Sequence, residues 1–283
     1  MKNLMCALSL SMLLLWSASA QAVFLDPYDN ALFADGLYGS VYANLYTSDE
    51  RTDSRGDKVG DTDFSALVTT VRASYYKTLL NVPVVFQVGI PFGEVREKKT
   101  ATETSTGLGD IWFGPGVFLY KNPETSTYLS YWFYAYAPTG EFDKNHSYSN
   151  MGWNHWYFEN QLAFSKVYGK FILDANINHF FHAEEKDNQV ETPDRLELEG
   201  SLAYQVTDKF IAGLNLEGHW DLGDYKVAGA TLQDSGATRY EVGPVVGYTF
   251  NDKLSATLRW NHDVSSKNDL KGDSYWLRVA YTF

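Results

Sequence analysis

The chain has almost no cysteine: Cys6 is the only one among 283 residues. It lies within a predicted export signal, so we expect the mature protein to have neither a disulfide nor a thiol nucleophile. Cys6 also stands at the start of the apolar run and not at the cleavage site, which excludes a lipoprotein anchor. Long apolar runs are missing as well. After the signal, no segment approaches about 18 consecutive apolar residues, which excludes a transmembrane helix.

The N-terminus has the organisation of a secretory signal. Lys2 supplies a positive charge, Met5 to Trp16 form an apolar core, and Ala20 and Ala22 offer small-residue cleavage sites. We predict cleavage after Ala22, with Ala20 as the alternative. The expected organisation is therefore a cleaved signal at residues 1–22 and one domain at residues 23–283.

Positive charge is scarce, with 23 Lys and Arg against 35 Asp and Glu, which gives a net charge of −12. This balance argues against nucleic acid as a main partner. Aromatic residues are abundant, at 20 Tyr, 17 Phe and 8 Trp. An exported, aromatic-rich chain that is polar overall is typical of a transmembrane β-barrel.

Period-two alternation of apolar and polar residues predicts strands along the whole chain. It is clearest in the second half, near residues 171–182, 196–206, 210–221, 240–250, 254–261 and 275–283. In the first half we expect strands near residues 36–47, 63–76, 84–93, 108–120, 128–138 and 154–165. Five short connections alternate with six long ones, the long ones near 48–62, 94–106, 140–152, 183–194, 222–237 and 265–272.

This pattern predicts an all-β fold, an antiparallel up-and-down transmembrane β-barrel of about twelve strands in the cell outer membrane. A soluble sandwich or a lipocalin-like barrel would show the same periodicity. The export signal, the aromatic residues at strand ends, the alternation of loop lengths and the C-terminal Phe283 favour the membrane barrel.

If the apolar rows face lipid, the alternate rows line the lumen. The acids expected to face inward are Asp110, Glu159, Asp174, Glu197, Glu199, Glu217, Asp221 and Glu241, and the bases are Arg72, Arg259 and Arg278. Two strands near 108–120 and 128–138 add aromatic rows, Trp112, Phe118 and Tyr120 on one and Tyr128, Trp132, Tyr134 and Tyr136 on the other. We predict a solute path along Trp112, Trp132, Tyr134, Tyr136, Asp110, Glu217, Glu241 and Arg259. The alternative is an ion-pair network and an aromatic girdle or plug that fill a narrow barrel.

Enzymatic signals are weak. The six histidines show no metal-ligand spacing, and the sequence has no nucleophile elbow or phosphate loop. The best catalytic candidate is His262. Outer-membrane phospholipases place His and Ser two residues apart on one lipid-facing row, but here that position is Val264. We therefore predict no enzyme, no catalytic residue, no metal site and no cofactor.

Three segments in order carry a family resemblance: Gly107-Leu108-Gly109-Asp110, Tyr136 to Asp143, and Gly152 to Trp156. They resemble the "meta-pathway of phenol degradation" outer-membrane family. The resemblance implies a barrel proposed to transport hydrophobic or aromatic compounds, and it supplies no catalytic residues. We expect Gly107, Gly109 and Gly140 to occupy strand entries and turns where a Cβ would clash.

Together these features predict an outer-membrane channel for passive uptake of small hydrophobic or aromatic solutes. A structural or adhesive barrel that acts through its outer loops is the alternative, and a lipid hydrolase is a third. The expected partners are outer-membrane lipid, lipopolysaccharide, a small-molecule solute, and the barrel-assembly machinery, which we expect to recognise Phe283.

Overall fold

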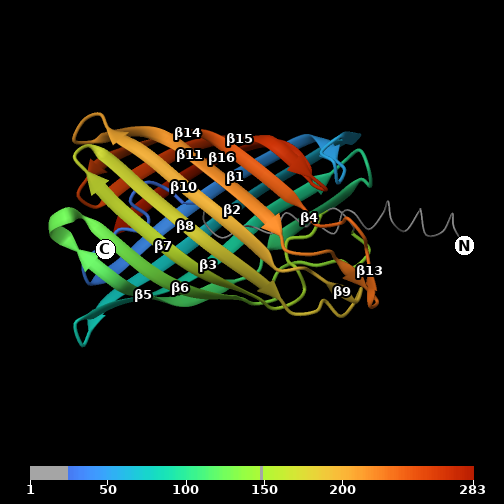
Figure 1. The fold of residues 1–283 in the computed structure, drawn as a ribbon, viewed down its shortest axis with the longest axis horizontal. Coiled ribbons are helices and arrows are strands. Elements are labelled where there is room, and N and C mark those ends of the chain that lie inside the picture. The colour runs from blue at the N-terminus through green and yellow to red at the C-terminus, as the bar shows by residue number, and fades with distance from the viewer. Residues whose placement is uncertain (1–24, 147–148) are drawn as a thin grey trace, which may run out of the picture.

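Twelve antiparallel strands close into a barrel in the computed structural model, which describes residues 25–146 and 149–283 (Figure 1). The wall strands are β1 (Gly36–Thr52), β2 (Lys58–Leu79), β3 (Val82–Glu97), β5 (Trp112–Asn122), β6 (Thr127–Tyr136), β7 (Tyr157–Tyr168), β8 (Phe171–His182), β10 (Arg195–Gln205), β11 (Phe210–Asp221), β14 (Thr238–Asn251), β15 (Leu254–Lys267) and β16 (Leu270–Thr282). Each pairs with its neighbours in the chain, and β1 pairs with β16 to close the barrel. The predicted fold class and number of strands are confirmed.

The remaining elements are small and lie at the ends of the barrel. β4 (Glu103–Leu108) pairs with the last six residues of β3, Phe92 to Glu97, and η1 (Pro123–Thr125) forms the turn between β5 and β6. A three-stranded sheet of β9 (Val190–Glu191), β12 (Lys226–Val227) and β13 (Ala230–Thr231) lies at the end opposite the C-terminus (Figure 1). Within residues 25–146 and 149–283, no helix is long and apolar enough to cross a membrane.

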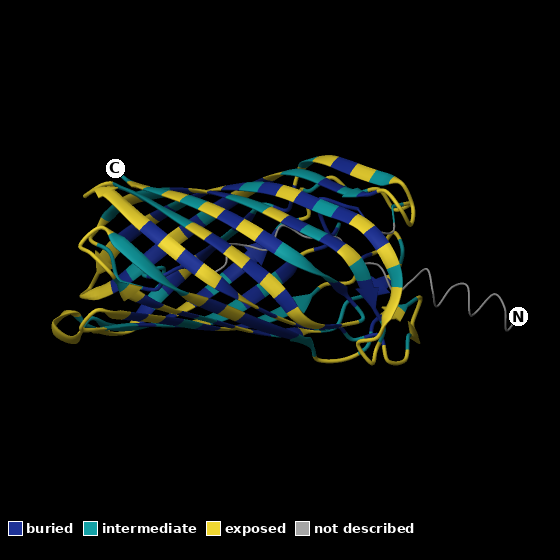
Figure 2. Ribbon diagram, turned by 90° about the horizontal axis from the view of Figure 1, so that it is seen from above, coloured by how far each residue is buried: buried dark blue, intermediate teal, exposed yellow. Residues whose placement is uncertain are grey.

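Side chains alternate between buried and exposed along the wall strands (Figure 2). On β15, for example, Leu258 and Trp260 are exposed while Arg259 and Asn261 are buried. Apolar rows therefore face outward and polar rows face the lumen, as the parity of the sequence predicts. The connections that follow β2, β5, β7, β10 and β14 are short and lie at one end of the barrel, called here the turn end. The other connections, most of them longer, lie at the opposite end, called the loop end.

Three expectations about the strands are wrong. The connection expected at 48–62 is limited to residues 53–57, because β1 and β2 stay paired as far as Thr52 and Lys58. The connection expected at 265–272 consists of Asn268 and Asp269 only, because β15 stays paired with β14 as far as Lys267 and β16 is paired with β1 from Leu270 onward. Tyr120, expected in the lumen, is 50% exposed and faces outward. A register shift between Phe118 and Tyr120 adds one residue to β5 and so reverses the side-chain parity beyond it.

Candidate functional site

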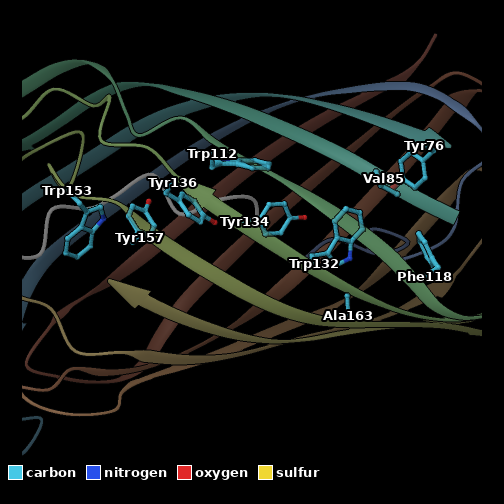
Figure 3. Close-up of a cluster of buried hydrophobic side chains, with 10 residues drawn as sticks. All are labelled: Tyr76, Val85, Trp112, Phe118, Trp132, Tyr134, Tyr136, Trp153, Tyr157 and Ala163. Atoms are coloured by element: carbon cyan, nitrogen blue, oxygen red, sulfur yellow. The ribbon is translucent and has the colours of Figure 1, made fainter. Parts of the chain in front are cut away.

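An aromatic wall covers one side of the lumen (Figure 3). It contains the predicted Trp112, Trp132, Tyr134 and Tyr136, and Tyr157 joins them from β7. The Trp132 and Tyr134 rings are stacked with centroids 5.9 Å apart, and those of Tyr136 and Tyr157 are stacked at 4.1 Å. Trp112 meets Tyr134 edge-on at 5.4 Å. These contacts hold large aromatic faces in fixed positions along the lumen.

The two indoles lie flat on the barrel wall because glycines face them on the neighbouring strands. Gly89 on β3 is paired with Trp112, and Gly116 on β5 is paired with Trp132. A Cβ at Gly89 would stand 2.1 Å from the Trp112 ring, and one at Gly116 would stand 2.2 Å from the Trp132 ring. A larger residue at either position would push the indole into the lumen.

The opposite wall is acidic. Glu199 on β10 is paired with Glu217 on β11, which is paired in turn with Glu241 on β14. All three side chains are buried inside the barrel. Arg259 on β15 lies with its guanidinium 4.9 Å from the ring centroid of Trp276. The lumen thus has an aromatic side and a charged side.

Residues 25–33, called here the N-terminal segment, lie inside the lumen. Asp29 forms ion pairs with Arg72 at 3.0 Å and with Arg278 at 3.1 Å. The backbone N–H of Tyr28 donates to Asp174 at 2.8 Å. All three partners belong to wall strands far away in the sequence, so the segment is attached to opposite sides of the barrel.

Leu25, at the start of this segment, is also attached to the barrel wall, by three hydrogen bonds. The Leu25 N–H donates to Glu199 at 3.0 Å, and its carbonyl accepts from Asn215 at 2.9 Å and from Arg259 at 3.0 Å. Arg259, which we predict to lie on the solute path, holds the N-terminal segment through its guanidinium.

The N-terminal segment separates two cavities. The first, called here the aromatic cavity, has a volume of about 70 Å³ and lies toward the loop end. The second has a volume of about 370 Å³ and is lined by the turns that follow β10 and β14. Asp29 and Arg72 line both, because their ion pair stands between them.

The predicted site residues fall into three places. Trp112, Trp132, Tyr134 and Tyr136 all line the aromatic cavity. Glu217, Glu241 and Arg259 are buried in the lumen but do not line that cavity. Asp110 lies apart from both groups, in the link between β4 and β5 at the loop end.

Asp110 joins the family-like segments to one another. Its carboxylate accepts the Gly140 N–H at 2.9 Å and the Trp153 N–H at 2.8 Å. A Cβ at Gly152 would stand 2.7 Å from the Asp110 carboxylate and 2.7 Å from the Gly140 Cα, so glycine is required at this contact. Burial raises the pKa of Asp110 to about 6, although the two N–H donors oppose the shift. The carboxyl is still largely ionised at pH 7. We call this arrangement the Asp110 junction.

Sequence reasoning missed several lumenal groups. The buried Arg195 forms a 2.8 Å ion pair with Asp221, and Arg239 approaches Asp263 at 3.6 Å. Both arginines lie at the loop end of their strands, where our expected strand boundaries stopped short. Residues two positions apart on a strand face the same side, so counting back two positions from Glu197 and from Glu241 would have identified Arg195 and Arg239 as lumenal.

His262 does not show the arrangement of a hydrolase. It lies on the outer face of β15, and its Nδ1 is 3.0 Å from the Asp273 carboxylate. Val264, two residues on, is also exposed, as predicted. Within the described ranges no serine hydroxyl hydrogen-bonds to His262. The third functional alternative therefore has no geometric support at this residue.

The strand order, the outward apolar rows and the polar lumen define a transmembrane barrel of the outer-membrane kind. The chain belongs to the family described as "Putative MetA-pathway of phenol degradation", whose model matches residues 48–279.

Solved structures share the fold. An outer membrane channel from Pseudomonas putida F1 has a TM-score of 0.85 at 22% identity, covering 92% of this chain and 100% of that one. The NanC porin has a TM-score of 0.52 at 9% identity, covering 87% and 100%. The translocator domain of the autotransporter NalP from Neisseria meningitidis has 0.51 at 14%, covering 89% and 90%. A comparison with the curated proteins finds no match.

Proposed function

We propose that the protein is an outer-membrane channel for passive uptake of small hydrophobic or aromatic solutes, which bind first in the aromatic cavity. The observation that carries the proposal is this cavity, with Trp112, Trp132 and Tyr134 on one wall. Flat rings offer stacking area to an aromatic or apolar molecule, and tyrosine hydroxyls add hydrogen-bonding groups. The carboxylates Glu159, Glu197 and Glu199 on the same cavity disfavour anions.

Passage toward the turn end requires the N-terminal segment to move, because it stands between the two cavities. Its attachments are ion pairs and hydrogen bonds, which break and re-form without chemistry. The proposed channel is therefore a gated path driven by the solute gradient and needs no cofactor. Ions would cross it slowly while the segment stays in place.

Replacing Trp132 with alanine tests the binding step. Loss of one stacking ring is expected to weaken binding of a small phenol by about two- to tenfold, and to slow its uptake into proteoliposomes correspondingly. The matched control is Tyr131→Ala, because Tyr131 is the next residue on β6 and faces outward. Equal uptake by the wild type, Trp132→Ala and protein-free liposomes would refute the proposal.

We also propose that the barrel-assembly machinery recognises Phe283. The side chain is exposed beside Tyr281, with ring centroids 5.1 Å apart, and the Phe283 N–H donates to the Leu37 carbonyl at the closure of the barrel. Deleting Phe283 is expected to reduce the amount of heat-modifiable barrel in the outer membrane. Barrel that does insert should keep the wild-type solute preference, since Phe283 is far from the aromatic cavity. Wild-type insertion of the deletion variant would contradict this.

A further inference from the structure

We propose that Glu197, Glu217 and His219 form a binding site for a divalent transition-metal ion inside the lumen. This site adjoins the aromatic cavity, which Glu197 also lines, but it does not depend on the transport proposal. All three side chains are buried, and one ligand atom from each lies within 4.8 Å of the others.

The barrel brings these groups together through strand register. Glu197 on β10 is paired with His219 on β11. Glu217 stands two residues before His219 and so shares its inward face. Ligands of one zinc ion at bond lengths of about 2.0–2.2 Å stand roughly 3–4 Å apart, so small side-chain rotations would bring these atoms into range. No ligand spacing is visible in the sequence because two strands contribute.

A second observation comes from Glu217. Its side chain is 4% exposed, and within the described part of the chain no N–H group or alcohol donates to its oxygens, while its close polar neighbour is another carboxyl, that of Glu241. The His219 Nδ1 is 4.0 Å from one of these oxygens. A buried carboxylate without donors is costly unless a cation or a proton accompanies it. The space between Glu217 and His219 is where such a cation would lie.

A carboxylate lies near the second ring nitrogen of His219, as is common around metal-binding histidines. Its Nε2 is 3.6 Å from the buried Asp269 carboxylate. Metal-binding histidines commonly direct the second ring nitrogen to a carboxylate, which fixes the tautomer and orients the other nitrogen toward the ion. With a proton on Nε2 facing Asp269, Nδ1 would present its lone pair toward Glu217.

Charge also favours a cation. Glu199 and Glu241 flank Glu217 in register, and together they place three carboxyl groups side by side across β10, β11 and β14. Two arginines also face this acidic group: Arg195, which pairs with Asp221, and Arg239, which approaches Asp263 and Asp269. The acids outnumber these arginines, so a divalent ion would offset further negative charge.

The ligand atoms of the proposed site indicate which metal ions it would bind. One imidazole and two carboxylates suit Zn²⁺ and neighbouring divalent transition metals better than Ca²⁺ or Mg²⁺, which prefer oxygen ligands alone. Three protein ligands leave a coordination position for water, which makes the ion exchangeable. Entry is available from the aromatic cavity, because Glu197 lines it.

The test is calorimetric titration of Zn²⁺ into the full-length protein, stripped of metal and held in detergent. We expect one saturable site per barrel. Glu217→Gln and His219→Gln should each weaken it by at least about tenfold, and Asp269→Asn by about 10- to 100-fold. The matched control is Glu159→Gln, another buried lumenal acid, which should bind Zn²⁺ like the wild type. Heat-modifiable gel mobility verifies that each variant is folded.

A second measurement needs no variant. Co²⁺ added to the wild-type protein should give visible absorption bands of a four- or five-coordinate site, and Zn²⁺ should abolish them. Absence of saturable Zn²⁺ binding and of these bands would overturn the proposal, and would indicate that Glu217 and Glu241 share a proton instead. Binding that survives both Glu217→Gln and His219→Gln in folded protein would overturn it too.

Discussion

Deleting residues 25–33 while keeping the export signal is expected to raise the single-channel conductance of the barrel severalfold. The segment crosses the lumen and separates the aromatic cavity from the cavity at the turn end. Its removal would join the two spaces. Strand pairing would be unaffected, because the first wall strand begins at Gly36. Planar-bilayer recording of purified protein measures the effect directly.

A point variant shows what happens when the N-terminal segment is held more weakly but is still present. Asp29→Asn weakens the ion pairs to Arg72 and Arg278, so we expect brief openings to the large conductance and not a permanently open pore. The control is Asp35→Asn, because Asp35 pairs with Lys77 at the turn end and lies outside both cavities. If the deletion variant conducts like the wild type, the N-terminal segment does not limit passage.

The alternation of apolar and polar residues predicted which way most wall side chains point, because a wall residue faces either the lipid or the lumen. On β15 the outward Leu258 and inward Arg259 follow directly from this rule. On β6 both rows are aromatic, so periodicity alone does not decide between them, and the expected lumenal row was the one that contains Trp132. The structure places Trp132, Tyr134 and Tyr136 inside. The rule failed at Tyr120, where one inserted residue reverses parity without any sequence signal that we could identify.

The N-terminal segment could not be predicted in the same way. It has no periodicity, since it belongs to neither the wall nor a loop. Its conformation depends on partners more than 140 positions away, such as Asp174 for Tyr28 and Glu199 for Leu25. The candidate metal site is hidden for a related reason, because its ligands meet only when β10 and β11 are in register.

The Asp110 junction explains physically why the family-like segments occur together. Gly140 and Gly152 approach so closely that a Cβ on either would overlap the other, and Asp110 bonds to the N–H groups of Gly140 and Trp153. Thr139 adds a hydroxyl that accepts the Ile111 N–H at 2.9 Å. These segments therefore fasten the two ends of the connection between β6 and β7, residues 137–143 and 152–156, to the rim of the barrel beside the aromatic cavity that Trp153 lines.

Asp110→Ala is accordingly expected to release this loop and destabilise the protein by up to about 6 kcal/mol, because the buried Trp153 N–H and the half-buried Gly140 N–H would each lose a partner at about 1–3 kcal/mol. Asp110→Asn should have a smaller effect, since one amide oxygen can still accept while the NH₂ group opposes the second donor. Limited proteolysis should cut residues 137–156 faster in the alanine variant, and thermal unfolding should begin at lower temperature. Asp143→Ala is the control, because Asp143 lies in the same loop but is exposed and contacts its near neighbour Asn145. Equal cleavage of Asp110→Ala and Asp143→Ala would mean that the junction does not hold the loop.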